Sequence, residues 1–210
     1  MFITFEGLDG SGKTTIVDKL RDFLAQNYSH LSFVFTREPG GCGLKEAEKI
    51  REVILDKENE IDPMSEAVLF AASRRLHLEK IIWPSLKEGK IVICDRYIDS
   101  SIAYQGAGKQ IGVEKVRALN EIVIENTYPN ATFLFDISAQ EARKRLLAKT
   151  NHSDDRMEMN KIDFFTRTYD AYHDLAKQEP NRYYIIDATK SVEEVFEQVK
   201  IEIIKLLNNK

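Results

Sequence analysis

A glycine-rich stretch near the start of the chain has the residue types and spacing of a phosphate-binding loop. Its letters GLDGSGKT match the pattern G-x-x-x-x-G-K-S/T. Glycines let several backbone N–H groups point at one phosphate, and the positive N-terminus of a following helix adds to them. In such a site Lys13 reaches the β- and γ-phosphates of a nucleotide, and the Thr14 hydroxyl ligates Mg²⁺. The predicted loop consists of Gly7, Leu8, Asp9, Gly10, Ser11, Gly12, Lys13 and Thr14.

The segments on either side of this loop favour phosphate binding over an ordinary glycine-rich turn. Phe2–Glu6 is short, apolar and aromatic, as in a buried strand. The residues after Lys13 place apolar side chains at helical spacing, which predicts a helix. A strand, the loop and a helix in this order are the context that the pattern requires. The sequence therefore predicts a nucleotide site, but this motif alone does not name a reaction.

A second group of candidate residues stands at the ends of apolar strands. Asp95, Asp136 and Asp187 each close such a run, and each is able to cap the turn that follows. Only Asp95 is followed at once by an arginine, Arg96. A carboxylate for Mg²⁺ or its water shell, beside an arginine for a phosphate, is the arrangement that phosphoryl transfer needs. We therefore predict that Asp95 and Arg96 are functional.

The cations expected at one edge of the sheet point to two phosphorylated substrates. Lys13, Arg37 and Arg96 map to that edge, and Arg74 is able to reach it from a helix, unless it only snorkels from an apolar face. This is a high local charge for a chain with a net charge of −4. An acceptor phosphate needs charge neutralisation and in-line placement, whereas an acceptor hydroxyl needs a carboxylate base. The arginines favour a nucleoside monophosphate as the acceptor.

The polar stretch 150–160 lacks periodicity, and we predict that it forms a mobile lid over ATP. Closure of such a lid excludes water and delivers an arginine to the transferring phosphoryl group. Arg156 is the first candidate for that arginine, and Arg143 and Lys149 remain alternatives. The competing interpretation of this charged run is a solvated helix face.

These side chains require a scaffold that brings them to one edge, and the rest of the sequence predicts it. Buried strands that alternate with helices form a parallel sheet covered on both faces, with ligands at the carboxyl ends of the strands. We predict an α/β fold with about five strands in a single domain, residues 1–210. The expected strands are Phe2–Glu6, Ser32–Thr36, Lys90–Asp95, Ala131–Asp136 and Tyr183–Asp187. The expected helices follow Lys13 and span Leu44–Leu55, Asp62–Leu86 with a break or kink at Pro84, Val113–Asn126, Ser138–Lys149, Lys161–Gln178 and Ser191–Leu207.

The composition argues against several other classes of protein. Of the 210 residues, 43% are hydrophobic and 30% charged, as in a soluble globular domain, and no apolar run has membrane-spanning length. The negative net charge argues against a protein that coats nucleic acid. Two cysteines, Cys42 and Cys94, are too few for a disulfide framework and indicate the reducing cytoplasm. The four histidines lack metal-ligand spacing.

Several segments together resemble the thymidylate kinase family, nearly from end to end. They are FEGLDGSGKTT (5–15), FTREPGG (35–41), LFAASR (69–74), DRYIDSSIAYQGAG (95–108), DRME (155–158) and DFFTRTYDAYHDLA (163–176). The first is shared by many nucleotide-binding proteins, whereas the second and fourth together are specific. The resemblance implies a P-loop NTPase-type fold, phosphorylation of dTMP to dTDP by ATP with Mg²⁺, and a homodimer built from helices.

The resemblance also implies which residues would surround dTMP. Phe70 would stack on thymine, although a phenylalanine on a half-apolar helix is otherwise more often part of the core. Arg96, joined by Arg37, would hold the acceptor phosphate, and Asp9 would reach the 3′-hydroxyl of the deoxyribose. Pro39 would follow a cis peptide bond. The implied dTMP-binding residues are Asp9, Arg37, Glu38, Pro39, Phe70, Arg74, Arg96, Ser101, Tyr104 and Gln105.

The same resemblance implies how ATP and the metal would be held. Thr14 and Asp95 would serve Mg²⁺, with Glu38 near the sugar and the metal, and Ala188 would lie beside the adenine. The loop has glycines where some relatives carry an arginine, so the chain is similar to the bacterial kind that supplies this arginine from the lid. The implied catalytic residues are Lys13, Asp95, Arg96 and Arg156.

Other functions compete with this interpretation. A kinase for a different monophosphate or for a deoxynucleoside is the nearest, but the second would need a base and would not need Arg37 and Arg96 together. A nucleotide-dependent switch would need a water-positioning residue and a guanine- or partner-reading motif, and we do not predict a GTPase. A catalytically silent phosphate-binding protein is opposed by the intact Lys13, Thr14 and Asp95.

Overall fold

The computed structural model describes residues 1–148 and 162–208, which build an α/β fold around one parallel sheet. The five strands lie in the order β2-β3-β1-β4-β5, and every neighbouring pair is parallel. Their bounds are β1 Phe2–Gly7, β2 Phe33–Arg37, β3 Ile91–Asp95, β4 Ala131–Asp136 and β5 Tyr183–Asp187. The sheet and its strands, each within a residue of its expected bounds, confirm the prediction.

The central strands are apolar because both of their faces are covered. Every residue of β1 is buried, and its one internal threonine, Thr4, bonds the hydroxyl of Thr132 on β4 at 2.9 Å. In the register of the sheet, Phe5 pairs with Asp95 on β3 and with Phe133 on β4. The carboxyl ends of β1 and β3 therefore lie side by side, and the loop after β1 lies next to the Asp95–Arg96 pair.

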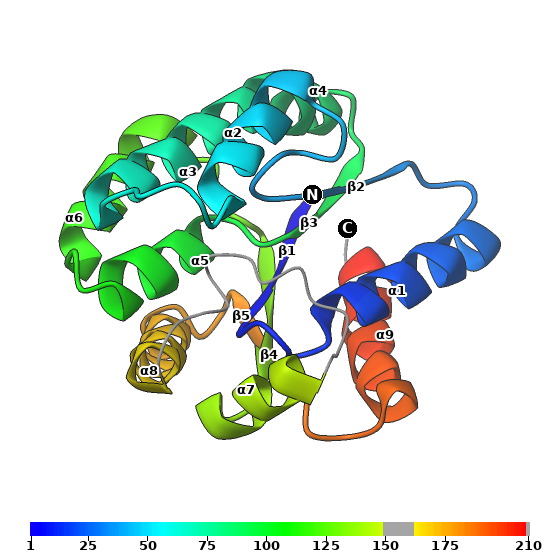
Figure 1. Ribbon diagram of the computed structural model, residues 1–210. Helices are drawn as coiled ribbons and strands as arrows, with labels where there is room; N and C mark the ends of the chain where they lie inside the picture. Colours follow the sequence, from blue (N-terminus) through cyan, green and yellow to red (C-terminus); the bar gives the residue numbers. More distant parts are fainter. Residues whose placement is uncertain (149–161, 209–210) are drawn as a thin grey trace.

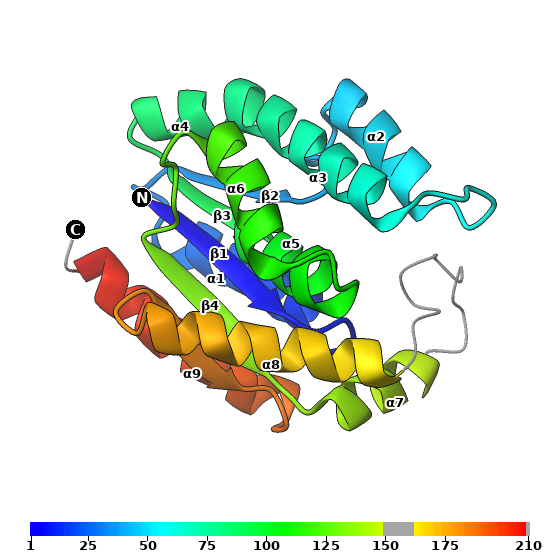
Figure 2. The same cartoon turned by 90° about the vertical axis from the view of Figure 1, so that its left-hand side faces the viewer.

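Helices cover both faces of this sheet (Figure 1). α1 (Lys13–Asn27) and α9 (Val192–Asn208) pack together on one face. On the other side α3 packs against α2 and α6, and α8 packs against the segment that follows α5 (Figure 2). The bounds of the remaining helices are α2 Lys45–Leu55, α3 Pro63–His77, α4 Trp83–Lys87, α5 Ile98–Ser101, α6 Val113–Ile124, α7 Ala139–Ala148 and α8 Ile162–Gln178.

The long helical segment after Asp62 changes type before Pro84 instead of breaking at it. The Asp62 carboxylate caps α3 by accepting hydrogen bonds from the backbone N–H groups of Met64 and Ser65. A π-helical segment, η1 (Leu78–Ile82), joins α3 to α4, and Pro84 stands in the first turn of α4. A first turn does not use the backbone N–H that proline lacks. The predicted break is thus a junction between helical segments.

The structure contains one helical segment that the sequence analysis does not predict. α5 continues into a second π-helical segment, η2 (Ile102–Gly108), which packs against both α6 and α8. The approach of η2 to α8 is close, because a Cβ atom on Gly108 would stand 2.6 Å from Thr168 Oγ1. π-Helical turns inside helices often mark functional sites. This segment forms part of the site described below.

Three further expectations concern the lid, membrane-spanning helices and the number of domains. The stretch 150–160, which the sequence predicts as a lid, falls outside the described residues. Within the described ranges, no helix is long and apolar enough to cross a membrane. The described strands all belong to one sheet. The assignment of residues 1–210 to a single kinase domain stays a prediction.

Candidate active site

The glycine-rich stretch forms a tight loop between β1 and α1. Gly7, Gly10 and Gly12 have φ angles of 134°, 85° and 89°, a region that residues with side chains rarely adopt. Gly10 also lies against α7, because a Cβ atom there would stand 2.4 Å from the carbonyl oxygen of Ala142. α1 begins at Lys13, so its unpaired N–H groups face the loop. The predicted strand–loop–helix unit is confirmed.

The Lys13 side chain folds back over this loop. Its ammonium donates to the carbonyl oxygens of Gly7 and Leu8, each at 3.0 Å, and to the Ser11 hydroxyl at 3.3 Å. Burial, with a further contribution from the nearby Arg96, lowers the pKa of Lys13 to about 8. A negative phosphate in the loop would oppose both effects. The charged state of Lys13 is therefore favoured most when an anion is bound.

Thr14 and Asp95 meet where the sequence predicts a magnesium ion. The Thr14 hydroxyl donates to Asp95 Oδ2 at 3.3 Å. The other carboxylate oxygen, Oδ1, is buried and has no hydrogen-bond partner among the described residues. An unpaired oxygen beside a hydroxyl fits a hydrated cation, and Mg²⁺ is commonly held this way next to nucleotide phosphates. Residues 1–148 and 162–208 contain no cluster of three or more His, Cys, Asp or Glu side chains suited to a metal.

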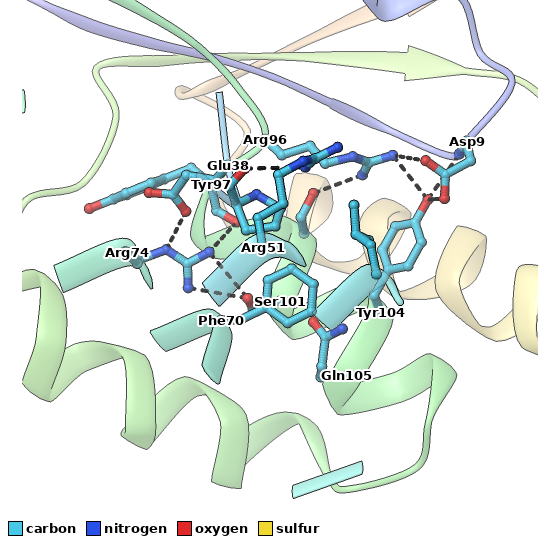
Figure 3. A pocket seen from close by; sticks show the side chains of 13 residues that line it. Asp9, Glu38, Arg51, Phe70, Arg74, Arg96, Tyr97, Ser101, Tyr104 and Gln105 are labelled. Atoms are coloured by element: carbon cyan, nitrogen blue, oxygen red, sulfur yellow. Dashed lines mark hydrogen bonds and ion pairs between the residues drawn. The ribbon is translucent and has the colours of Figure 1, made fainter. Parts of the chain in front are cut away.

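A cavity of about 120 Å³ opens beside the loop (Figure 3). Its walls come from the loop, the turn after β2, helices α2 and α3, and the segment that follows β3. Most of the predicted dTMP-binding residues line it, namely Asp9, Glu38, Pro39, Phe70, Arg74, Arg96, Ser101, Tyr104 and Gln105. The sequence analysis does not single out the other lining residues, which are Arg51, Leu55, Tyr97 and Ser100.

Arg96 connects the cavity to the loop. Its guanidinium donates to Asp9 Oδ1 and, at 3.2 Å, to the Tyr104 hydroxyl, and it also stacks 4.8 Å above the centre of the Tyr104 ring. Burial alone would raise the pKa of Asp9, but Arg96 and Lys13 outweigh it and lower that pKa. A cation and a carboxylate are thus fixed together where β1 and β3 end, at the edge of the sheet to which the sequence assigns Arg96.

Arg74 is buried, with 1% of its surface exposed, so it does not snorkel. Its Nε donates to Glu38 Oε2 at 2.7 Å, and its two Nη atoms donate to the Ser101 hydroxyl at 3.1 and 3.2 Å. The other oxygen of Glu38 bonds the His77 ring at 3.0 Å. Both carboxylate oxygens of Glu38 are therefore engaged within the protein. Glu38 therefore supports the cavity wall, and its place near the metal stays a prediction.

Phe70 offers an aromatic face to the cavity. It projects from α3 one helical turn before Arg74, and its ring lies near Ser101 and Gln105 (Figure 3). Unlike the core residue Phe5, it is only partly buried. The structure therefore places Phe70 at the cavity and not in the core.

The structure places Arg51 at the cavity, whereas the residue expected there from the resemblance is Arg37. The Arg37 guanidinium pairs with Glu48 at 3.0 Å, donates to the Pro39 carbonyl oxygen at 2.7 Å, and does not line the cavity. Arg51 donates to the same carbonyl oxygen at 3.2 Å and does line it. No motif surrounds Arg51, and only the folding of α2 over the turn after β2 brings it there. The Glu38–Pro39 peptide bond is cis, as the resemblance implies.

The residues expected around ATP lie beyond the loop. Ala188 follows β5 and is buried, and its carbonyl oxygen accepts a hydrogen bond from Arg145 at 2.9 Å. Arg143 is exposed on α7, the helix that lies against Gly10. Lys149 and Arg156, the other candidates for the arginine or lysine that contacts the transferring group, lie outside the described residues.

Comparison with known proteins identifies the family. A sequence model of the thymidylate kinase family matches residues 5–199. A thymidylate kinase of Mycoplasmopsis agalactiae is 47% identical over 210 residues, which cover 100% of this chain and 96% of the relative. One of Clostridium novyi is 43% identical over 200 residues, covering 95% and 96% respectively. The chain belongs to the thymidylate kinase family. A crystal structure of thymidylate kinase from Ehrlichia chaffeensis has a TM-score of 0.76 at 41% identity, with 99% of this chain and 98% of that chain covered.

Membership of the thymidylate kinase family fixes the reaction. It is the phosphorylation of dTMP to dTDP with ATP, a step in dTTP synthesis, so the chain is an ATP-dependent nucleoside monophosphate kinase. The predicted activity and the resemblance are confirmed, and so is the α/β class of the fold. The competing interpretations as a nucleoside kinase or a silent phosphate-binding protein are set aside.

One short stretch of the sequence matches a motif of another class of nucleotide-binding protein. The letters NKID at 160–163 fit Asn-Lys-x-Asp, a pattern that reads guanine in GTPases. Its last two residues, Ile162 and Asp163, begin α8, and its first two lie outside the described residues. The match of residues 5–199 to the thymidylate kinase family supports an ATP-dependent kinase and not a GTPase.

Proposed function

We propose that the cavity binds dTMP, that the loop binds the phosphates of ATP, and that phosphoryl transfer takes place between Arg96 and Lys13. The observation that carries this proposal is the position of Arg96, which contacts the loop residue Asp9 and also lines the cavity. A monophosphate bound at Arg96 would lie at the carboxyl ends of the strands, where the loop presents the second nucleotide.

The wall of the cavity suits the nucleoside part of dTMP. Phe70 offers a ring on which thymine stacks, and Ser101 and Gln105 offer polar groups to the edge of the base. The Tyr104 hydroxyl donates to Asp9 at 2.9 Å, and this pair on the cavity wall supports a deoxyribose site beside both residues. In this arrangement Asp9 accepts a hydrogen bond from the 3′-hydroxyl, and Arg74 fixes the wall through Glu38 and Ser101.

The phosphate end needs charge and alignment but no base. An oxygen of the dTMP phosphate attacks the γ-phosphorus of ATP, and the bond from that phosphorus to the β,γ-bridging oxygen breaks. Arg96 neutralises the attacking phosphate, and Lys13 neutralises the β- and γ-phosphates. Arg37 acts indirectly, because its bond to the Pro39 carbonyl holds the turn that lines the cavity.

Magnesium and the donor side complete the proposal. We assign Thr14 and Asp95 to Mg²⁺, because the Asp95 Oδ1 atom is buried and lacks a partner among the described residues. When bound, Mg²⁺ neutralises charge on the β- and γ-phosphates. Ala188 would lie beside the adenine, and Arg156, Arg143 or Lys149 would contact the transferring phosphoryl group.

We also propose that the chain forms a homodimer through α2, α3 and α6. These helices pack side by side at one end of the molecule (Figure 1). They expose large apolar side chains, namely Val53 on α2, Met64 and Val68 on α3, and Ile122 on α6. Ile122 is 78% exposed in the isolated chain. A second copy of the same face would bury these side chains and compensate for their exposure.

The proposed role of Arg96 is tested with Arg96→Ala, measuring turnover of dTMP together with thermal unfolding. Loss of the cation that neutralises the acceptor phosphate is expected to lower kcat by about a hundredfold or more while the protein stays folded. Arg75→Ala is the matched control, since Arg75 forms its ion pairs with Glu79 and Glu125 at the surface. Near-normal turnover by folded Arg96→Ala would contradict the assignment.

A further inference from the structure

Gln105 is held by a buried carboxylate outside the predicted site. Gln105 lines the cavity and is 1% exposed, and its Nε2 atom donates to Glu66 Oε1 at 3.1 Å. Glu66 lies on α3 with none of its surface exposed. Its other oxygen, Oε2, accepts from the Lys109 ammonium at 2.7 Å, and this ion pair compensates for burial of the carboxylate. A chain of contacts thus leads from Lys109 through Glu66 to the cavity.

These contacts fix which end of the Gln105 amide faces the ligand. A carboxylate only accepts hydrogen bonds, whereas an amide donates from its NH₂ group and accepts at its oxygen. Glu66 therefore requires the NH₂ group of Gln105 to point toward it. The amide oxygen is left on the side of Phe70, where Figure 3 shows it. The Gln105 side chain therefore presents a hydrogen-bond acceptor, and not a donor, to the cavity.

We propose that Glu66 is a positioning residue for base selection, because it makes Gln105 present an acceptor that pairs with the N3–H of thymine or uracil. Cytosine has a lone pair at N3 in place of a proton. Its N3 would face the Gln105 oxygen as a second acceptor, and no hydrogen bond would form between them. The inference rests on the proposed function, since it requires that the base lie between Phe70 and Gln105. It assigns selection between bases to a residue that touches no substrate.

A second pair of contacts supports the same choice of base. The Ser101 hydroxyl oxygen accepts from both Nη atoms of Arg74, at 3.1 and 3.2 Å. Its own O–H group is then directed to donate. A donor beside an acceptor matches the 4-oxo and N3–H groups of thymine or uracil. The same pair opposes the 4-amino group and unprotonated N3 of cytosine.

The test compares the wild type with Glu66→Gln, using KM for dTMP and dUMP, the inhibition constant of dCMP against dTMP, and KM for ATP. The Lys109 ammonium only donates, so the amide oxygen of a glutamine at position 66 is expected to face Lys109 and its NH₂ group to face Gln105. The Gln105 oxygen then turns toward position 66, and the Gln105 NH₂ group faces the base. The KM values for dTMP and dUMP are expected to rise by the same factor, about tenfold. dCMP is expected to inhibit as well as before or better, and KM for ATP to stay within about twofold. Glu79→Gln, the same change in the surface pair with Arg75, should alter none of these constants.

A rescue variant separates positioning from packing. Glu66→Gln combined with Gln105→Glu exchanges the two groups, so an acceptor again faces the base, and the preference for dTMP over dCMP should return toward the wild-type value. This double variant also carries the test if Glu66→Gln alone does not fold. Equal losses for dTMP and dCMP, no change in either, or no recovery in the double variant would overturn the inference. Failure of the wild type to phosphorylate dTMP would instead overturn the proposed function.

Discussion

Lys13 is the residue whose proton should respond most directly to ATP. Burial and Arg96 lower its pKa from 10.5 to about 8 in the nucleotide-free protein. Bound phosphates raise it again, so between about pH 8 and 10.5 the complex holds more protons than the free components. ATP binding is therefore expected to take up about half a proton per site at pH 8, and ATP affinity is expected to fall as the pH rises through this window.

Calorimetry of MgATP binding at pH 8, in buffers of different ionisation enthalpy, measures this uptake. Lys13→Arg is the matched control, because arginine keeps its charge at this pH and should take up no proton. Binding enthalpies of the wild type that do not depend on the buffer at pH 8 would contradict the account of Lys13.

The sequence predicts a functional role for residues inside a motif but not for isolated residues. Gly7–Thr14 carries its chemistry in its spacing, and Asp95–Arg96 ends an apolar run, so both are visible in a single sequence. Arg51 belongs to an amphipathic helix with a solvated face, and nothing near it in the sequence marks a ligand. Glu66 is likewise an ordinary polar residue in the first turn of α3. Their roles arise from packing between elements that are distant in the chain.

Among the elements, η2 packs closely against α8 at Gly108. A Cβ atom on Gly108 would meet Thr168 Oγ1 at 2.6 Å and a carbon of the Phe164 ring at 2.7 Å, both on α8. Gly108→Ala is therefore expected to lower the free energy of unfolding by about 1–3 kcal/mol, since the overpacked helices must separate. Because η2 also carries Tyr104 and Gln105, KM for dTMP should rise more than KM for ATP.

Urea unfolding and steady-state kinetics of Gly108→Ala check both parts of this prediction. Gly89→Ala is a comparison from a different turn, where an added Cβ atom meets nothing within 4 Å and only the positive φ of 76° is strained. An unchanged KM for dTMP in a destabilised Gly108→Ala protein would separate the packing of η2 from the shape of the cavity.

The helices and strands differ in how clearly the sequence predicts them. Strands buried on both faces, such as Ile91–Asp95, appear in the sequence as short apolar runs, which predict their bounds to within a residue. The amphipathic helices follow the 3.6-residue period and were found as well. The segment Ile98–Gly108 follows neither pattern, because it is a short helical turn that continues into π-helix and contains two glycines. Its residues were expected at the site only through the family resemblance.

The whole molecule is proposed to form a dimer through α2, α3 and α6, so a charge introduced on this face should separate the two subunits. Ile122→Glu is expected to convert a dimer to a monomer, because an ionised side chain would be buried against its copy. Ile201→Glu on α9, 49% exposed, is the matched control and should leave the dimer intact. Light scattering coupled to gel filtration measures the mass directly. A wild-type protein that is monomeric at micromolar concentration would contradict the proposal.

ATP consumption with Mg²⁺ across a panel of acceptors measures whether the loop and the cavity together transfer a phosphoryl group from ATP to dTMP. The panel consists of dTMP, dUMP, dCMP, dGMP, AMP, GMP, CMP, UMP, thymidine and a reaction without acceptor. We expect rapid turnover with dTMP, weaker turnover with dUMP, which lacks one methyl group, and little with the others. Turnover of thymidine in place of dTMP, or slow hydrolysis that no acceptor changes, would contradict this expectation.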